Sequence, residues 1–134
     1  MNDKERILRC GYDALNNLEL AKRELKSAKG WGIIDLCGGG LFSGLMKHSD
    51  MSNAGAYIDN ARYSIQEMGD LVRASEIANM DVGHFDILTF FDLFYDSFLP
   101  DLFSSLRIKE ALDRIDGAIY ELSDIIRRIE LDYQ

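Results

Sequence analysis

Residues 30–51 read GWGIIDLCGGGLFSGLMKHSDM, and this stretch decides how the rest of the chain can fold. It holds six of the eleven glycines and the single tryptophan, Trp31. Glycine is unfavourable inside helices because it loses much backbone freedom on ordering. We therefore expect a glycine-rich connector over residues 30–49 that separates two helices.

Apolar residues recur every seven positions on both sides of this connector. Residues 3–29, 50–79 and 105–132 each carry the pattern, which predicts long, coiled-coil-like antiparallel helices. The repeating positions are Ile7, Ala14, Ala21 and Ala28; Met51, Ile58, Ile65 and Val72; and Ile108, Ile115, Leu122 and Ile129. The last segment has the widest apolar stripe, so we expect it to contact at least two other helices.

Residues 84–99 are rich in aromatic side chains. As a helix, they place apolar residues on about half of the helical wheel and Asp86, Asp92 and Asp96 on the other half. Pro100 ends the segment. The sequence therefore predicts one all-α domain over residues 1–134: a bundle of three long helices, a short aromatic helix and the connector folded over one end.

The net charge of −8 is unevenly distributed. Residues 74–106 contain six acidic residues and no basic one. Such a chain repels phosphate backbones and anionic membrane surfaces, and no cluster of Lys and Arg offsets this repulsion. We expect no nucleic-acid partner.

The amino terminus, MNDKERILRCG, is charged and lacks the apolar run of a signal peptide. The longest apolar run, Trp31–Met46, is shorter than the roughly 20 residues of a membrane-spanning helix. Cys10 and Cys37 lack a CxxC neighbour and are interpreted as buried thiols. These features favour a cytoplasmic protein without membrane insertion.

The glycine-rich stretch does not match either phosphate-binding template. Leu45 stands where a P-loop requires Lys, and no predicted strand precedes the glycines as in a dinucleotide fold. The histidines also lack the Glu-x-x-His spacing of di-iron bundles. We expect no cofactor and no metal, although the acidic helix offers a weak alternative as a calcium or magnesium site.

Ser43 lies in LFSGL, which lacks the first glycine of the GxSxG nucleophile motif. Neither histidine has a Cys or Ser partner at a recognisable spacing. We therefore predict no catalytic residue, and catalysis is the weaker hypothesis.

The aromatic segment allows three interpretations. Its rings can fill the bundle core, line a pocket for an apolar ligand, or anchor a protein interface. In the third case the acidic rim would select a basic partner.

Two stretches, GWGIIDLCGGGLFSGLMKHSDM and FFDLFYDSF, resemble small uncharacterised all-helical proteins and domains of Gram-positive bacteria. The resemblance implies a helical fold and a bacterial cytoplasmic setting. It implies no particular activity or site residue.

Two functional hypotheses follow from the sequence. The first is a non-enzymatic protein–protein interaction or structural module, which binds a protein partner or self-associates through a helix face. The alternative is a binder of a small or apolar ligand, or an enzyme, with its site between the connector and the aromatic acidic helix. The candidate residues of that surface are Trp31, Asp35, Lys47, His48, Asp92 and Asp96.

Overall fold

The structure is a computed structural model of the chain, and it describes residues 2–28, 49–75, 81–82, 85–98 and 108–132. Over these ranges the protein is an all-α helical bundle, which confirms the predicted fold class. The helices are α1 (Asp3–Ala28), α3 (Ser49–Arg73), α4 (Ile87–Leu93) with its π-helical continuation η3 (Phe94–Phe98), and α6 (Ile108–Asp132).

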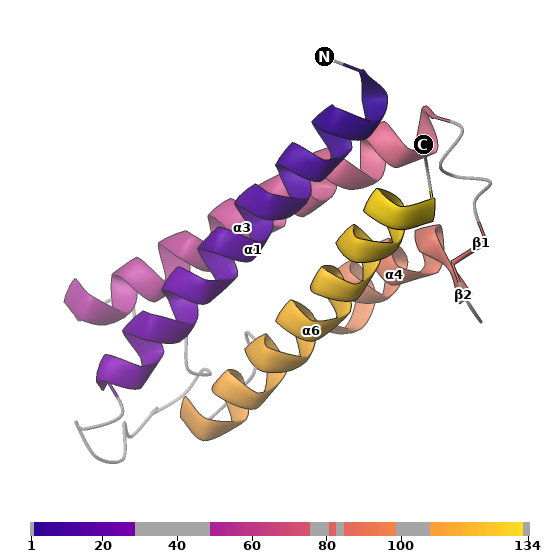
Figure 1. The fold of residues 1–134 in the computed structure, drawn as a ribbon. Coiled ribbons are helices and arrows are strands. Elements are labelled where there is room, and N and C mark those ends of the chain that lie inside the picture. Colours follow the sequence, from indigo (N-terminus) through magenta and orange to yellow (C-terminus); the bar gives the residue numbers. More distant parts are fainter. Residues whose placement is uncertain (1, 29–48, 76–80, 83–84, 99–107, 133–134) are drawn as a thin grey trace.

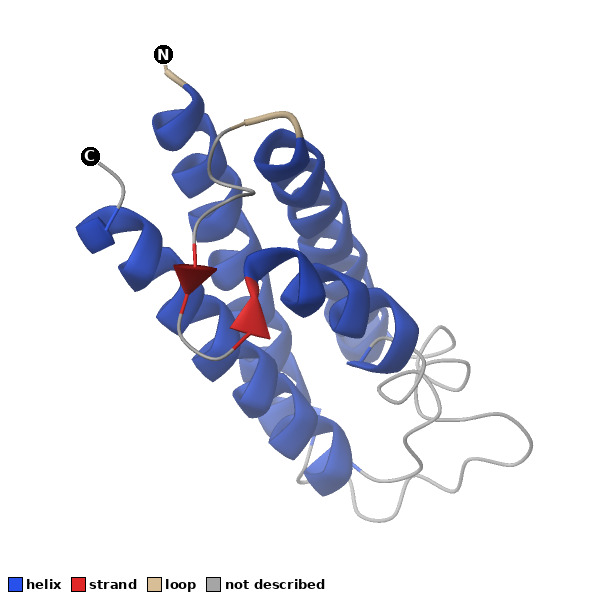
Figure 2. Cartoon of the chain, turned by 90° about the vertical axis from the view of Figure 1, so that its right-hand side faces the viewer, coloured by secondary structure: helices blue, strands red, loops and turns tan. Residues whose placement is uncertain are grey.

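The helices alternate in direction around the bundle (Figures 1 and 2). α1 and α3 lie side by side and run antiparallel, and α6 lies antiparallel along another side of α1. α4 packs against α3 and faces α6. This is the up-down-up-down arrangement in which each apolar stripe is shared by neighbouring helices.

α1 begins and ends close to its predicted limits. The backbone amide of Glu5 donates a hydrogen bond of 2.8 Å to Oδ1 of Asn2, which caps the first turn. Asp3 and Glu5 lie in the first turn and Lys26 in the last, so each charge suits the helix dipole.

The second helix is shorter than predicted. The heptad pattern predicts a helix that reaches Asn79, but α3 ends at Arg73. The backbone amide and the hydroxyl of Ser75 both donate to the carbonyl of Val72, at 3.1 and 3.0 Å. A serine that satisfies a terminal carbonyl in this way competes with continued helix.

The aromatic helix also begins later than its predicted start at residue 84. Strands β1 (Asp81–Val82) and β2 (Phe85–Asp86) pair antiparallel, with Val82 opposite Phe85, before the helix starts at Ile87. An extended backbone at Phe85 excludes the helical conformation there. The last helix is predicted over residues 105–132, and α6 begins at Ile108. Residues 105–107 lie outside the described residues.

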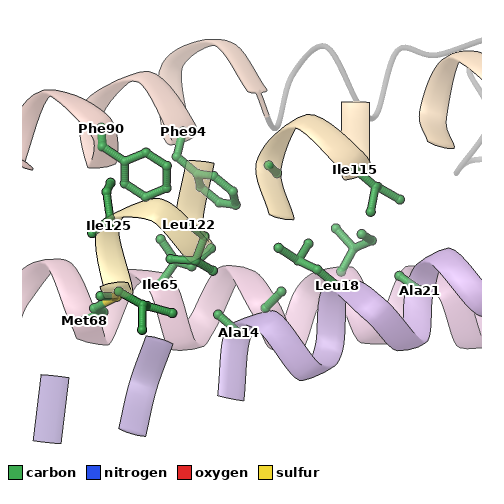
Figure 3. Packing of buried hydrophobic residues seen from close by; sticks show 14 of the residues in the cluster. Ala14, Leu18, Ala21, Ile65, Met68, Phe90, Phe94, Ile115, Leu122 and Ile125 are labelled. Carbon is green, nitrogen blue, oxygen red and sulfur yellow. The ribbon is translucent and has the colours of Figure 1, made fainter. Parts of the chain in front are cut away.

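The heptad positions form the core. Ile7, Ile65 and Ile115, from three different helices, are fully buried. Figure 3 shows Phe90 and Phe94 of α4–η3 lying above Leu122 and Ile125 of α6, with Ile65 and Met68 of α3 and Ala14 and Leu18 of α1 beneath. The prediction that α6 contacts at least two helices is therefore confirmed, because it meets α1 and the aromatic rings.

One glycine permits close helix packing. A Cβ atom on Gly11 would lie 2.9 Å from Ile126, so its missing side chain lets α6 approach α1. The ring of Phe91 lies against Gly69 of α3, where a Cβ atom would be at ordinary contact distance, 3.4 Å from Cγ of the ring.

Of the connector predicted over residues 30–49, residues 30–48 lie outside the described residues, and Ser49 is the first residue of α3. None of the helices that the structure describes combines the length and apolar character needed to cross a bilayer.

Candidate functional site

An open groove lies between α4–η3 and α6. Its volume is about 640 Å³, and its apolar lining consists of Phe90, Leu93, Phe94, Phe98 and Ala118. Volumes of about 300–1,000 Å³ are typical of ligand-binding clefts. It is larger than the clefts beside Cys10 and beside Gly69, whose volumes are about 430 and 360 Å³.

One wall of the groove is a row of phenylalanine rings. Phe90 and Phe94 have ring centroids 6.2 Å apart, and Phe94 and Phe98 stack with centroids 4.8 Å apart and an interplanar angle of 29°. Phe91 belongs to the same helix but turns towards Gly69 of α3. Phe90 and Phe94 are also buried in the core, so these two rings hold the helix to the bundle as well as line the groove.

The rings of the groove wall follow a change in helix type. Residues Phe94–Phe98 form a π-helix, and Phe94, Ser97 and Phe98 of this segment line the groove. The wider π-helical turn changes the direction in which successive side chains point. Such segments are rare and occur frequently at functional sites.

The opposite wall, on α6, contains a glycine that no internal contact requires. Gly117 is exposed, and no atom lies within 4 Å of the position its Cβ would occupy. A glycine inside a helix costs about 1 kcal/mol relative to alanine. No contact among the described residues requires a glycine at this position, so packing does not offset the cost. The bare backbone at Gly117 faces the groove.

Polar side chains complete the lining. Thr89, Ser97 and Glu121 are exposed, and Arg114 is partly buried. The Arg114 guanidinium donates to Oε1 of Glu110 on the preceding turn at 2.9 Å. The arrangement can therefore bury an apolar group while meeting polar or charged atoms beside it.

Of the six candidate residues predicted from the sequence, the structure describes two, Asp92 and Asp96. Trp31, Asp35, Lys47 and His48 lie outside the described residues. Asp92 is exposed and pairs with Arg73 of α3, with Nη2 and Oδ1 3.4 Å apart, and Asp96 is also exposed. The described residues that line the groove include neither aspartate.

A second, smaller cleft lies between α1 and α3, where Cys10 is 8% exposed. Burial raises the pKa of the Cys10 thiol, and the carboxylates of Glu67 and Asp13 raise it further. A thiol with a raised pKa forms little thiolate and is a poor nucleophile or metal ligand. Among the described residues, no three His, Cys, Asp or Glu side chains are grouped as a metal site would require.

Comparison of the chain with protein-family models, with curated proteins and with solved structures gives no match. Function is therefore inferred from the groove itself. The sequence pattern indicates the aromatic wall as a candidate site, but not Arg114, Gly117 or Glu121 of α6. The sequence feature that could have indicated this part of the groove is Gly117, because it is a glycine inside a segment with a strong helical heptad pattern.

Proposed function

We propose that this protein is a non-enzymatic protein–protein interaction module, and that it binds the apolar face of a partner helix in the groove between α4–η3 and α6. The observation that carries the proposal is the pairing of an aromatic wall with a bare stretch of helix backbone at Gly117. In helix-in-groove recognition an amphipathic helix lays its apolar face into a hydrophobic groove. A glycine in the wall of the groove lets the partner approach its backbone closely.

An exposed leucine beside the aromatic wall supports this proposal. Leu93 lines the groove and is 56% exposed, whereas its neighbours Phe90 and Phe94 are buried in the core, at 8% and 4% exposed. Large apolar side chains that stay exposed beside an apolar hollow are typical of interaction sites. A partner helix that covers Leu93 and the edges of the rings would remove this surface from water.

The shape of the groove supports a helix more than an enclosed ligand. Its α4–η3 wall extends from Thr89 to Phe98, which corresponds to about 15 Å at 1.5 Å per residue. Its α6 wall extends from Arg114 to Glu121. Two to three turns of a partner helix would match this length, with anchors at positions i, i+4 and i+7.

The test is selection from a displayed library of helical peptides with Leu, Ile, Phe or Met at the anchor positions and Gln at the flanking positions. The bait is the full-length protein, and binding is then measured by fluorescence anisotropy. Gly117→Leu places a side chain in the groove and should abolish binding. Gly55→Leu is the matched control, because Gly55 of α3 also has no atom within 4 Å of its Cβ position.

Both substitutions replace glycine in a helix, so both should preserve or raise thermal stability. Binding by the wild type and by Gly55→Leu, but not by Gly117→Leu, is the result that we expect. Failure to select any binder, or equal binding by all three proteins, would contradict the proposal.

Binding of a small apolar molecule is the second candidate function, and the groove volume of about 640 Å³ favours it. It predicts that the fluorescence of anilinonaphthalene sulfonate rises with the wild type and with Gly55→Leu, and that Gly117→Leu removes the rise. A saturable signal of this kind without any peptide binder would favour the small molecule.

We place the protein in a reducing bacterial cytoplasm. The unpaired, buried thiol of Cys10 supports this part of the proposal. Fluorescence microscopy of a tagged full-length protein in the source cells would test it.

A further inference from the structure

The two walls of the groove carry most of the negative charge of the described chain. α4, η3 and α6 together contain nine acidic and four basic residues, a net charge of −5. α1 contains five acidic and six basic residues, and α3 contains four acidic and two basic ones. The bundle therefore has an acidic side, and the groove lies within it.

The basic residues of this side are largely engaged with acids of their own helix. Arg114 pairs with Glu110 at 2.9 Å, and Arg127 and Arg128 both pair with Asp124, at 2.7 and 2.9 Å. Two acids of these walls also pair with bases of other helices, Asp116 with Lys22 of α1 at 2.7 Å and Asp92 with Arg73 of α3 at 3.4 Å. Counting these two bases, the groove side keeps a net charge of −3. An apolar group entering the groove therefore meets a negative potential at its edge, where Glu121 is exposed.

We infer that the occupant of the groove is a basic amphipathic helix of another protein, with Lys or Arg residues flanking its apolar anchors. The inference rests on the proposed function and adds the charge of the partner. Complementary charge steers association and excludes wrong partners, so an acidic rim around an apolar groove selects basic flanks.

A second copy of this chain fits the same groove poorly. A twofold dimer through this face would place the same surface on both sides of the interface. Two acidic faces, each of net charge −3 after the pairs with Lys22 and Arg73 are counted, would then oppose each other. Like charges brought together across an interface are unfavourable, which is why the partner is inferred to be a different protein.

The experiment uses three synthetic peptides with the same anchor residues and with Lys, Gln or Glu at the flanking positions. Their affinities for the full-length protein are measured by fluorescence anisotropy. We expect the Lys peptide to bind at least about tenfold more tightly than the Glu peptide, because several exposed ion pairs act together. Raising the salt concentration should reduce this difference.

Two pairs of variants separate groove binding from general attraction to an acidic protein. Gly117→Leu should abolish binding of the Lys peptide, and Gly55→Leu should not, although neither changes the net charge. Glu121→Gln should lower the affinity for the Lys peptide by about two- to fivefold, which is the effect expected from the loss of one exposed ion pair. Asp59→Asn on α3, where Asp59 is 60% exposed, removes one negative charge elsewhere and should have no effect.

The outcomes are distinct. Equal affinities of the three peptides, each lost in Gly117→Leu, would overturn the charge inference and leave the proposed function intact. Binding of the Lys peptide that Gly117→Leu does not change would overturn the inference as non-specific attraction. A wild-type dimer in sedimentation that Gly117→Leu converts to a monomer would overturn it in favour of a second copy.

Discussion

A Cβ atom on Gly11 of α1 would lie 2.9 Å from both Cγ1 and Cδ1 of Ile126 in α6. Ile126 is only 2% exposed, and Met68 of α3 closes the same space, with its Cε 3.3 Å from the Cβ position. Three helices therefore meet at this glycine, and the spacing between α1 and α6 depends on its missing side chain.

Gly11→Ala should destabilise the protein. Overpacking a core typically costs about 1–3 kcal/mol, and the helix propensity of alanine offsets about 1 kcal/mol of this. We expect a net loss of about 1 kcal/mol in the free energy of unfolding, measured by urea denaturation. A second substitution, Ile126→Val, should relieve part of the loss in the Gly11→Ala background.

Gly117→Ala and Gly55→Ala should have the opposite effect. Neither Cβ position has an atom within 4 Å, so the gain in helix propensity is not cancelled by a clash. Each should raise the free energy of unfolding by about 0.4–1 kcal/mol. A loss of stability in either variant, seen in the same urea titration, would show that these glycines have a packing role in the free protein.

Cys10 should react slowly in the folded protein. Its side chain is buried, and burial raises the pKa of its thiol. In a Cys37→Ser variant, which leaves Cys10 as the one thiol of the sequence, labelling with iodoacetamide at pH 8 should become fast only in denaturant. Rapid labelling of the native variant would mean that the cleft beside Cys10 opens readily.

Asp124 should add stability that is lost in acid. Hydrogen bonds from Arg127 and Arg128 hold the pKa of this carboxyl below its ordinary value of 3.8. Because the folded-state pKa is depressed, the unfolded state binds more protons, and the contribution is present above about pH 4 and disappears as the pH falls through the folded-state pKa.

Asp124→Asn removes this contribution at neutral pH. The side chain is near the surface, so we expect a difference of less than about 1 kcal/mol between wild type and variant at pH 7. Urea titrations between pH 7 and pH 2 should show the two proteins converging at low pH. If the difference in the free energy of unfolding between wild type and Asp124→Asn stays constant from pH 7 to pH 2, the ionised Asp124 carboxyl is not the source of the stability.

The sequence by itself determined the helical class and the core. Heptad spacing identified Ile7, Ile65 and Ile115 as buried residues because a residue's place on a helix face depends only on the 3.6-residue period. Heptad spacing also predicts the end of the second helix at Asn79, whereas α3 ends at Arg73. Periodicity cannot detect that Ser75 turns its own amide and hydroxyl back to Val72.

The tertiary structure decided which glycines permit close contacts and where the groove lies. In sequence, Gly11, Gly69 and Gly117 all interrupt helices in the same way. Only the packing of α6 on α1 and of Phe91 on α3 shows that two of them meet neighbouring side chains and that Gly117 faces a hollow. Contacts between helices depend on their separation and rotation in space, and a one-dimensional pattern does not contain these quantities.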